Sequence, residues 1–172
     1  MRGQTSLDFA VGVSVFLLAL IAVFTFVPGT LGPFTGGGQE DIVAGNRVAA
    51  SLSEGLLGDP AQPHSLNRTC TVAFFQDSAP AYCNFEGGTL AERVGLGDDK
   101  QVNVTLRSNL TSDGDAGDVL CWSGSAIVER DNCGGGTPFT IGDTPPDSGT
   151  SVSARRIVDI EGIDATMLVE LW

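Results

Sequence analysis

The sequence has little positive charge and almost no lysine or histidine. Lys100 is its only lysine and His64 its only histidine, and 21 Asp and Glu against nine Lys and Arg give a net charge of −12. An acidic chain repels phosphate backbones, which argues against nucleic acid as a partner. Dense carboxylates with scarce lysine are typical of halophilic proteins, although an ordinary acidic extracellular protein has the same composition.

The sequence also lacks the residue combinations of common enzyme sites. His64 lies between two loop-like residues, Pro63 and Ser65, and no pattern supplies partners for a catalytic triad. The glycines at 134–136 are not followed by the Lys and the helix of a phosphate-binding loop. We therefore predict that the protein is not an enzyme and needs no cofactor. A secreted hydrolase would require a nucleophile and a base that the pattern does not offer.

Metal-binding motifs are missing too. No cysteines have the Cys-x-x-Cys spacing of a zinc site, and His64 is far from any ligand spacing. Asp113, Asp115 and Asp118 form an acidic cluster, but the regular twelve-residue calcium loop with its terminal Glu is absent. We predict a solvated acidic turn and no metal site.

Four cysteines are present: Cys70, Cys83, Cys121 and Cys133. An even number in a small extracellular domain is typical of disulfides. Three connectivities are open. Because neighbouring cysteines are only about a dozen residues apart, we predict the bonds Cys70–Cys83 and Cys121–Cys133, each stabilising by about 3 kcal/mol in the chain-entropy model.

Three Asn-x-Thr sequons begin at Asn67, Asn103 and Asn109. Each is a candidate N-glycosylation site, and such triplets also arise by chance. Together they agree with the cysteines in favouring an extracellular location.

One long hydrophobic run lies near the start of the chain. Residues 10–27 carry no charge, and Arg2 precedes them. A secretory signal has its small-residue cleavage site after the apolar core, whereas the junction Gly3–Gln4 lies before it. A helix over residues 4–27 would be about 36 Å long, enough to cross a hydrocarbon core of about 30 Å. An uncleaved single-span anchor is an alternative.

The residues before this run resemble a known processing motif. Gln4, Ser6, Asp8 and Phe9 match in register the Gln-x-Ser-x-Glu/Asp-Phe stretch of the class III signal peptide of archaeal type IV pilins. The resemblance implies that a prepilin peptidase cuts after Gly3. It covers about the first 27 residues, and the family more often has Glu where this chain has Asp8.

The carboxylate of Asp8 would lie about one helical turn inside the apolar helix. At bilayer depth a charge costs about 2.5–3.5 kcal/mol, so it needs a partner. The α-amino group freed at Gln4 has a reference pKa of about 7.7–8.0 and is largely protonated near neutral pH. It can neutralise Asp8 of its own or a neighbouring subunit. In pilins such pairing is thought to set axial register, which implies an assembly role for Asp8 and Phe9.

The rest of the chain predicts one extracellular domain. After a Pro/Gly hinge at 28–38, apolar residues recur at seven-residue spacing over 39–57, which predicts an amphipathic helix packed on a sheet. Two strands joined through 161–164 are predicted to form a hairpin. The predicted strands cover residues 70–75, 101–107, 118–122, 126–130, 153–160 and 165–172.

The predicted fold class is α+β and pilin-like: a long N-terminal hydrophobic helix, an amphipathic helix and an antiparallel β-sheet head over 39–172. The resemblance implies a major or minor structural subunit of an archaeal type IV pilus-like surface filament, involved in adhesion or filament assembly, with the leader 1–3 removed. Its expected partners are the prepilin peptidase, other copies or sister pilins, and the membrane before assembly, with the head outside the cell. A membrane-anchored binding domain that does not polymerise is the alternative.

Overall fold

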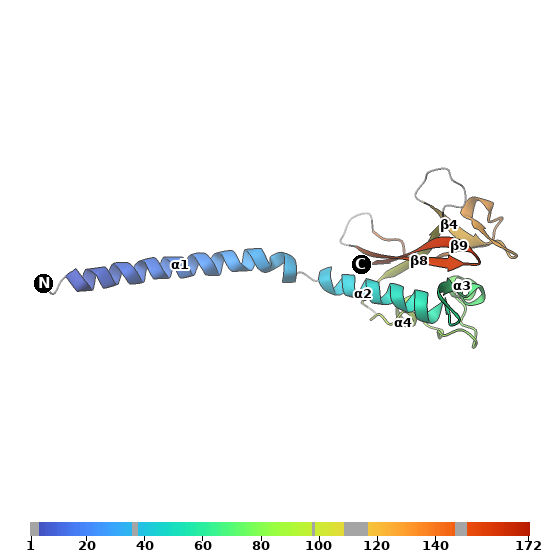
Figure 1. Ribbon diagram of the computed structural model, residues 1–172, viewed down its shortest axis with the longest axis horizontal. Coiled ribbons are helices and arrows are strands. Elements are labelled where there is room, and N and C mark those ends of the chain that lie inside the picture. Colours follow the sequence, from blue (N-terminus) through green and yellow to red (C-terminus); the bar gives the residue numbers. More distant parts are fainter. Residues whose placement is uncertain (1–3, 36–37, 98, 109–116, 147–150) are drawn as a thin grey trace. The chain divides into compact units, whose positions relative to one another are not determined.

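The chain forms two compact units, residues 1–39 and 40–172, in the computed structural model shown in Figure 1. The structure describes residues 4–35, 38–97, 99–108, 117–146 and 151–172. Within these ranges it describes side chains for residues 9–25 and from residue 40 onward.

The first unit contains one helix, α1, which spans Gln4–Thr35. We predicted that it would stop at Pro28, but the helix continues past this residue. A proline removes only one backbone N–H from the hydrogen-bond ladder, and helices can continue through such a position with a kink. The predicted hinge over 28–38 is therefore helical as far as Thr35.

A second helix, α2, spans Gly38–Ala50 and continues directly as the π-helix η1, Ser51–Leu56. The helix predicted over 39–57 is confirmed, and its predicted stop at Gly58 is where strand β1 begins. The predicted apolar face is correct only in the second half, where the buried residues are Val48, Ala49, Leu52 and Leu57. Ile42 and Val43 were also expected to pack on the sheet, but both are exposed.

A nine-stranded sheet forms the other layer of the head, in the order β1-β2-β8-β9-β3-β4-β5, with β6 beside β4 and β7 beside β3. Among the described strands, β2 and β8 run parallel, with Ser65 opposite Asp159, and the other pairs run antiparallel. The strands are β1 Gly58–Asp59, β2 Gln62–Leu66, β3 Val102–Ser108, β4 Asp118–Trp122, β5 Ile127–Glu129, β6 Thr137–Pro138, β7 Thr140–Gly142, β8 Val152–Ile160 and β9 Ile163–Leu171.

The predicted fold class is wrong in two respects. The sheet is mixed and not antiparallel, because β2 lies alongside β8 in the same direction. In addition, over the described part of the chain no helix is long and apolar enough to cross a membrane, so the hydrophobic span predicted over 4–27 is not found.

The segment predicted as a strand over 70–75 is also wrong, because it belongs to helix α3, Arg68–Phe75. The side chain of Asn67 caps this helix by accepting a hydrogen bond from the backbone N–H of Cys70 at 3.1 Å. Helical spacing turns Cys70, Ala73 and Phe74 into the core. The cap and this packing outweigh the strand preference of the aromatic and β-branched residues.

The hairpin predicted at the C-terminal end is confirmed as β8 and β9, with Ile160 opposite Ile163. The connection is shorter than predicted and consists of Glu161 and Gly162. Their φ angles of 54° and 82° are both positive, as a type I′ turn requires. This turn matches the right-handed twist of the two strands.

The core of the head lies between one face of the sheet and helices α2 and α3. Figure 1 shows both helices on the same side of strands β8 and β9. Gly45 allows α2 to approach closely, since a Cβ at this position would lie 2.9 Å from the Leu171 side chain. Phe74 is fully buried at the centre, with its ring edge-on to Phe75 and Phe85 at centroid distances of 5.5 Å.

Two polar contacts anchor the ends of helices in the head. The short helix α4, Leu90–Arg93, has a capping box in which Thr89 and Glu92 bond each other's backbone N–H groups. Hydrogen bonds from Thr89 hold the pKa of Glu92 below its usual range. Lys100 donates to Asp41 on α2 at 2.6 Å, and this bond raises the pKa of the chain's only lysine.

Candidate functional site

The predicted processing and assembly residues fall at the N-terminal end of α1. Gln4 is the first residue of the helix, and Asp8 and Phe9 follow within it. Gly3 lies outside the described residues, and the side chains of Gln4 and Asp8 lie outside the described side chains. The Phe9 side chain is 74% exposed.

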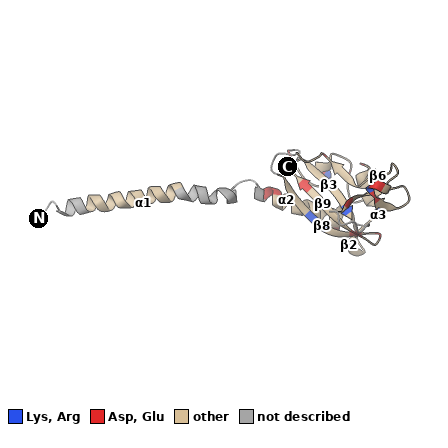
Figure 2. Cartoon of the chain, turned by 90° about the horizontal axis from the view of Figure 1, so that it is seen from above, with Lys and Arg blue, Asp and Glu red and all other residues tan. Residues whose placement is uncertain are grey.

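The described surface of α1 is apolar on all sides. Large side chains along it are exposed, including Phe9, Leu18 and Phe24. Its two polar side chains between residues 9 and 25 bond their own helix: Ser14 Oγ donates to the Ala10 carbonyl and Thr25 Oγ1 to the Ile21 carbonyl, each at 2.8 Å. Figure 2 shows no charged residue along the described part of this helix. Such a surface is typical of a helix that binds an apolar partner.

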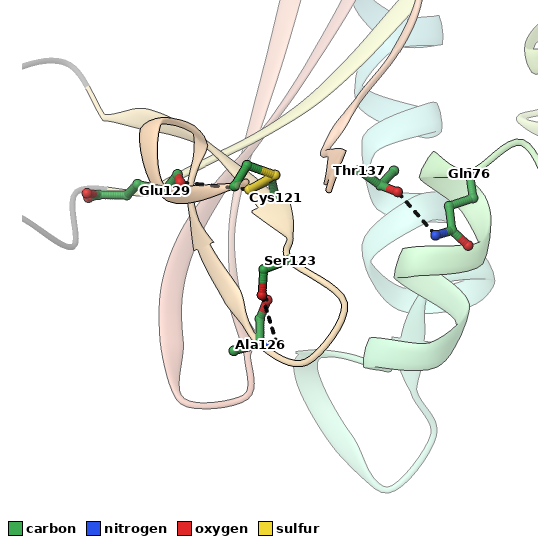
Figure 3. Close-up of a disulfide and its surroundings, with 7 residues drawn as sticks. Gln76, Cys121, Ser123, Ala126, Glu129 and Thr137 are labelled. Atoms are coloured by element: carbon green, nitrogen blue, oxygen red, sulfur yellow. Dashed lines mark hydrogen bonds between the residues drawn. A yellow bond between two sulfur atoms is a disulfide. The ribbon is translucent and has the colours of Figure 1, made fainter. Parts of the chain in front are cut away.

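Both predicted disulfides are confirmed. Cys70 on α3 bonds Cys83, and Cys121 on β4 bonds Cys133, with Cα–Cα distances of 5.6 Å and 5.9 Å. Figure 3 shows the second bond beside β4. Cys133 follows the single turn of 3₁₀-helix η2, Arg130–Asn132. One bond therefore joins α3 to the loop that carries Cys83. The other joins β4 to the segment that follows η2.

A surface pocket of about 330 Å³ lies between these two elements. One wall is α3, a second is the loop that carries Ser78 and Tyr82, and Trp122 at the end of β4 contributes the third. Both aromatic residues adjoin a disulfide cysteine, since Tyr82 precedes Cys83 and Trp122 follows Cys121. Side chains that line the pocket include Arg68, Thr69, Val72, Gln76, Tyr82 and Trp122.

Arg68 connects three parts of the head at the edge of this pocket. Its guanidinium carbon lies 5.4 Å from the centroid of the Trp122 ring, a cation–π arrangement. Its Nη1 donates to Glu161 Oε1 in the β8–β9 turn at 2.8 Å. Both charged side chains are partly exposed, so this ion pair contributes little stability and serves mainly to orient the guanidinium.

The far end of α3 is tied to the small strand β6. Gln76 Nε2 donates to Thr137 Oγ1 at 3.1 Å, and Figure 3 shows this bond crossing from the helix to the strand. Because β6 pairs with β4, the bond also fixes the helix relative to Trp122. This pocket was not predicted from the sequence. The available signal was the pair of dipeptides Tyr82–Cys83 and Cys121–Trp122.

The three sequons lie in different environments. Asn103 is buried in β3, where its Nδ2 donates to the Asp143 carbonyl at 2.9 Å and its Oδ1 accepts from Thr105. Its amide is therefore not accessible for modification in the folded head. Asn67 is partly exposed beside the exposed Thr69, and Asn109 lies outside the described residues.

Replacing Asn67 with alanine is expected to lower the free energy of unfolding by about 1 kcal/mol, because α3 loses its N-cap. Thr69→Ala is the matched control, since it removes the same sequon and keeps the cap. Urea unfolding of both variants separates the two effects. If they unfold alike, the cap has no measurable role. Intact mass of wild-type protein from the native cell reports whether Asn67 carries a glycan.

Within the described residues, no group of three His, Cys, Asp or Glu side chains is placed to hold a metal ion. Asp113 and Asp115 of the acidic cluster lie outside the described residues, and His64 is exposed. The folded head places Tyr82 and Trp122, each next to a disulfide cysteine, at the same pocket.

Comparison with known proteins identifies a family for the chain but no activity. No curated protein and no solved structure is similar enough to the chain to count as a match. One family model matches over residues 1–172, the full length of the sequence. The chain therefore belongs to a family of unknown function, DUF7287.

Proposed function

We propose that the chain is a structural subunit of an archaeal type IV pilus-like surface filament, matured by a prepilin peptidase that cuts between Gly3 and Gln4. The observation that carries this proposal is the position of α1. The first residues of α1 resemble the pilin processing motif, and from Phe9 onward the described part of the helix is uncharged and exposes apolar side chains.

The surface of α1 supports packing against copies of itself. Apolar area that remains in water costs about 25 cal/mol per Å², so side chains such as Phe9, Phe16 and Phe24 gain by being covered. A helix that is apolar all round has no side reserved for water. In a filament, sister helices surround each α1 and cover its whole circumference.

Asp8 gives this apolar packing a defined register. It is the only charged residue between Arg2 and Glu40. In the proposed filament its carboxylate pairs with the new α-amino group at Gln4 of a neighbouring subunit, because an unpaired charge among apolar helices is costly. Dispersion contacts between apolar helices favour no particular axial offset between neighbouring subunits, so they cannot set the register alone.

The head then faces the outside of the cell. Two disulfides suit an oxidising extracellular environment and reinforce the head beside its hydrophobic core. In this arrangement α1 supplies the contacts between subunits, and the head supplies the surface that meets other cells, surfaces or ligands.

Intact mass and N-terminal analysis test the proposal directly. Protein is taken from native membranes and from filaments sheared off the cell surface, with a cytoplasmic protein followed as a control for lysis. We expect the sheared fraction to begin at Gln4. A Met1 terminus found only in membranes would instead indicate an anchored binding domain that does not polymerise.

A further inference from the structure

We propose that the pocket between α3, the Ser78–Tyr82 loop and Trp122 binds a neutral saccharide ring. This goes beyond the filament assignment, because the residues that form the pocket all belong to the second unit. The inference therefore does not depend on how α1 assembles.

Both aromatic side chains of the pocket keep part of their surface accessible, Tyr82 more than Trp122, because Arg68 covers one face of the Trp122 ring. Tyr82 is the only tyrosine of the chain and is 70% exposed, and Trp122 is half-buried with Arg68 above its ring. Aromatic rings bury large apolar areas when they can, so an exposed ring at the rim of a pocket favours a ligand that covers it. The C–H face of a sugar ring provides a flat apolar surface of this kind.

Polar groups around the rings match the edge of the same ligand. Thr69 and Tyr82 carry hydroxyls, and Gln76 adds an amide. Hydroxyls both donate and accept, as sugar hydroxyls require. The volume of about 330 Å³ lies at the lower end for small-molecule sites, which fits one or two sugar rings.

The charges favour a neutral ligand over an anionic one. No carboxylate is among the described residues that line the pocket, although the chain has 21 Asp and Glu. The single lining charge, Arg68, is paired with Glu161 and so brings no net charge. The net charge of −12 further opposes the approach of an anion.

The pocket is also held in shape before any ligand arrives. The Cys70–Cys83 bond joins α3 to the loop beside Tyr82, and the Cys121–Cys133 bond fixes β4 beside Trp122. The Gln76–Thr137 hydrogen bond ties the two sides together. A site whose walls are already ordered loses less entropy when it binds.

The test uses the oxidised full-length chain in detergent micelles. Trp172→Phe leaves Trp122 as the only tryptophan, and its fluorescence is followed during titration with glucose, galactose, mannose, N-acetylglucosamine and glucuronic acid. We expect a saturable change with at least one of the four neutral sugars. In the same background, Tyr82→Ala should weaken binding about tenfold or more, equivalent to about 1.4 kcal/mol.

The control variant is Ile157→Ala, which removes an equally exposed apolar side chain on β8, away from the pocket residues, and should leave binding unchanged. Asp8→Ala should also bind normally, which separates this site from filament assembly. The proposal is overturned if no neutral sugar binds the folded chain, if only glucuronic acid binds, or if Tyr82→Ala binds as tightly as its parent.

Discussion

Replacing Asp8 with alanine is expected to abolish surface filaments while leaving the head folded. In the proposed filament this carboxylate is the only charged partner available to the Gln4 amine among the packed helices. Without it, the amine of each subunit loses its compensating charge, and a buried unpaired charge typically costs about 3–5 kcal/mol. The measurement is the amount of subunit in the sheared surface fraction, together with electron microscopy of the cells.

Two variants show whether any loss is specific to this carboxylate at this position. Asp8→Glu keeps the charge with a longer reach and should retain filaments. Asp131→Ala removes an exposed carboxylate of the head and should have no effect on assembly. Normal filaments in the Asp8→Ala strain would contradict the register mechanism. Loss of the protein from the membrane fraction as well would point instead to a defect before assembly.

Replacing Phe74 with alanine is expected to lower the free energy of unfolding by about 3–5 kcal/mol, because the ring is fully buried among other aromatic residues. The cavity left by the ring lies at the centre of the core, where α3 meets the loop that carries Phe85. Urea unfolding with both disulfides intact measures the change.

Comparing Val72→Ala with Phe74→Ala tests whether residues 70–75 form a helix or a strand. In a strand over 70–75, positions 72 and 74 would share one face and be equally buried. In α3, Val72 is only half-buried and Phe74 is fully buried. We therefore expect Val72→Ala to cost much less than Phe74→Ala. Equal and large losses would contradict the helix.

Several features were readable from the sequence because they depend on neighbouring residues. Each disulfide closes a loop of about a dozen residues, so proximity along the chain predicted the pairing. The β8–β9 hairpin depends on two adjacent strands and a turn with Gly162, and its pattern is complete within one segment. The stretch from Phe9 to Thr35 is uncharged whatever the fold, and this alone indicates an apolar helix.

Other features were decided only by tertiary packing. Residues 70–75 have the composition of a strand, but the Asn67 cap and burial of Phe74 stabilise a helix there. β2 lies parallel to β8 although Ser65 and Asp159 are 94 residues apart in sequence, and no local pattern encodes such a pairing.

The pocket depends on packing in the same way. Arg68 and Tyr82 lie near each other in sequence, but Trp122 comes from a distant segment and becomes their neighbour only in the folded head. Composition and short-range spacing were enough to predict the disulfide pairing, the β8–β9 hairpin and the chemical character of each segment, because they act within a few residues. The sheet order and the pocket followed from contacts between distant segments, where burial of apolar area decides which surfaces meet.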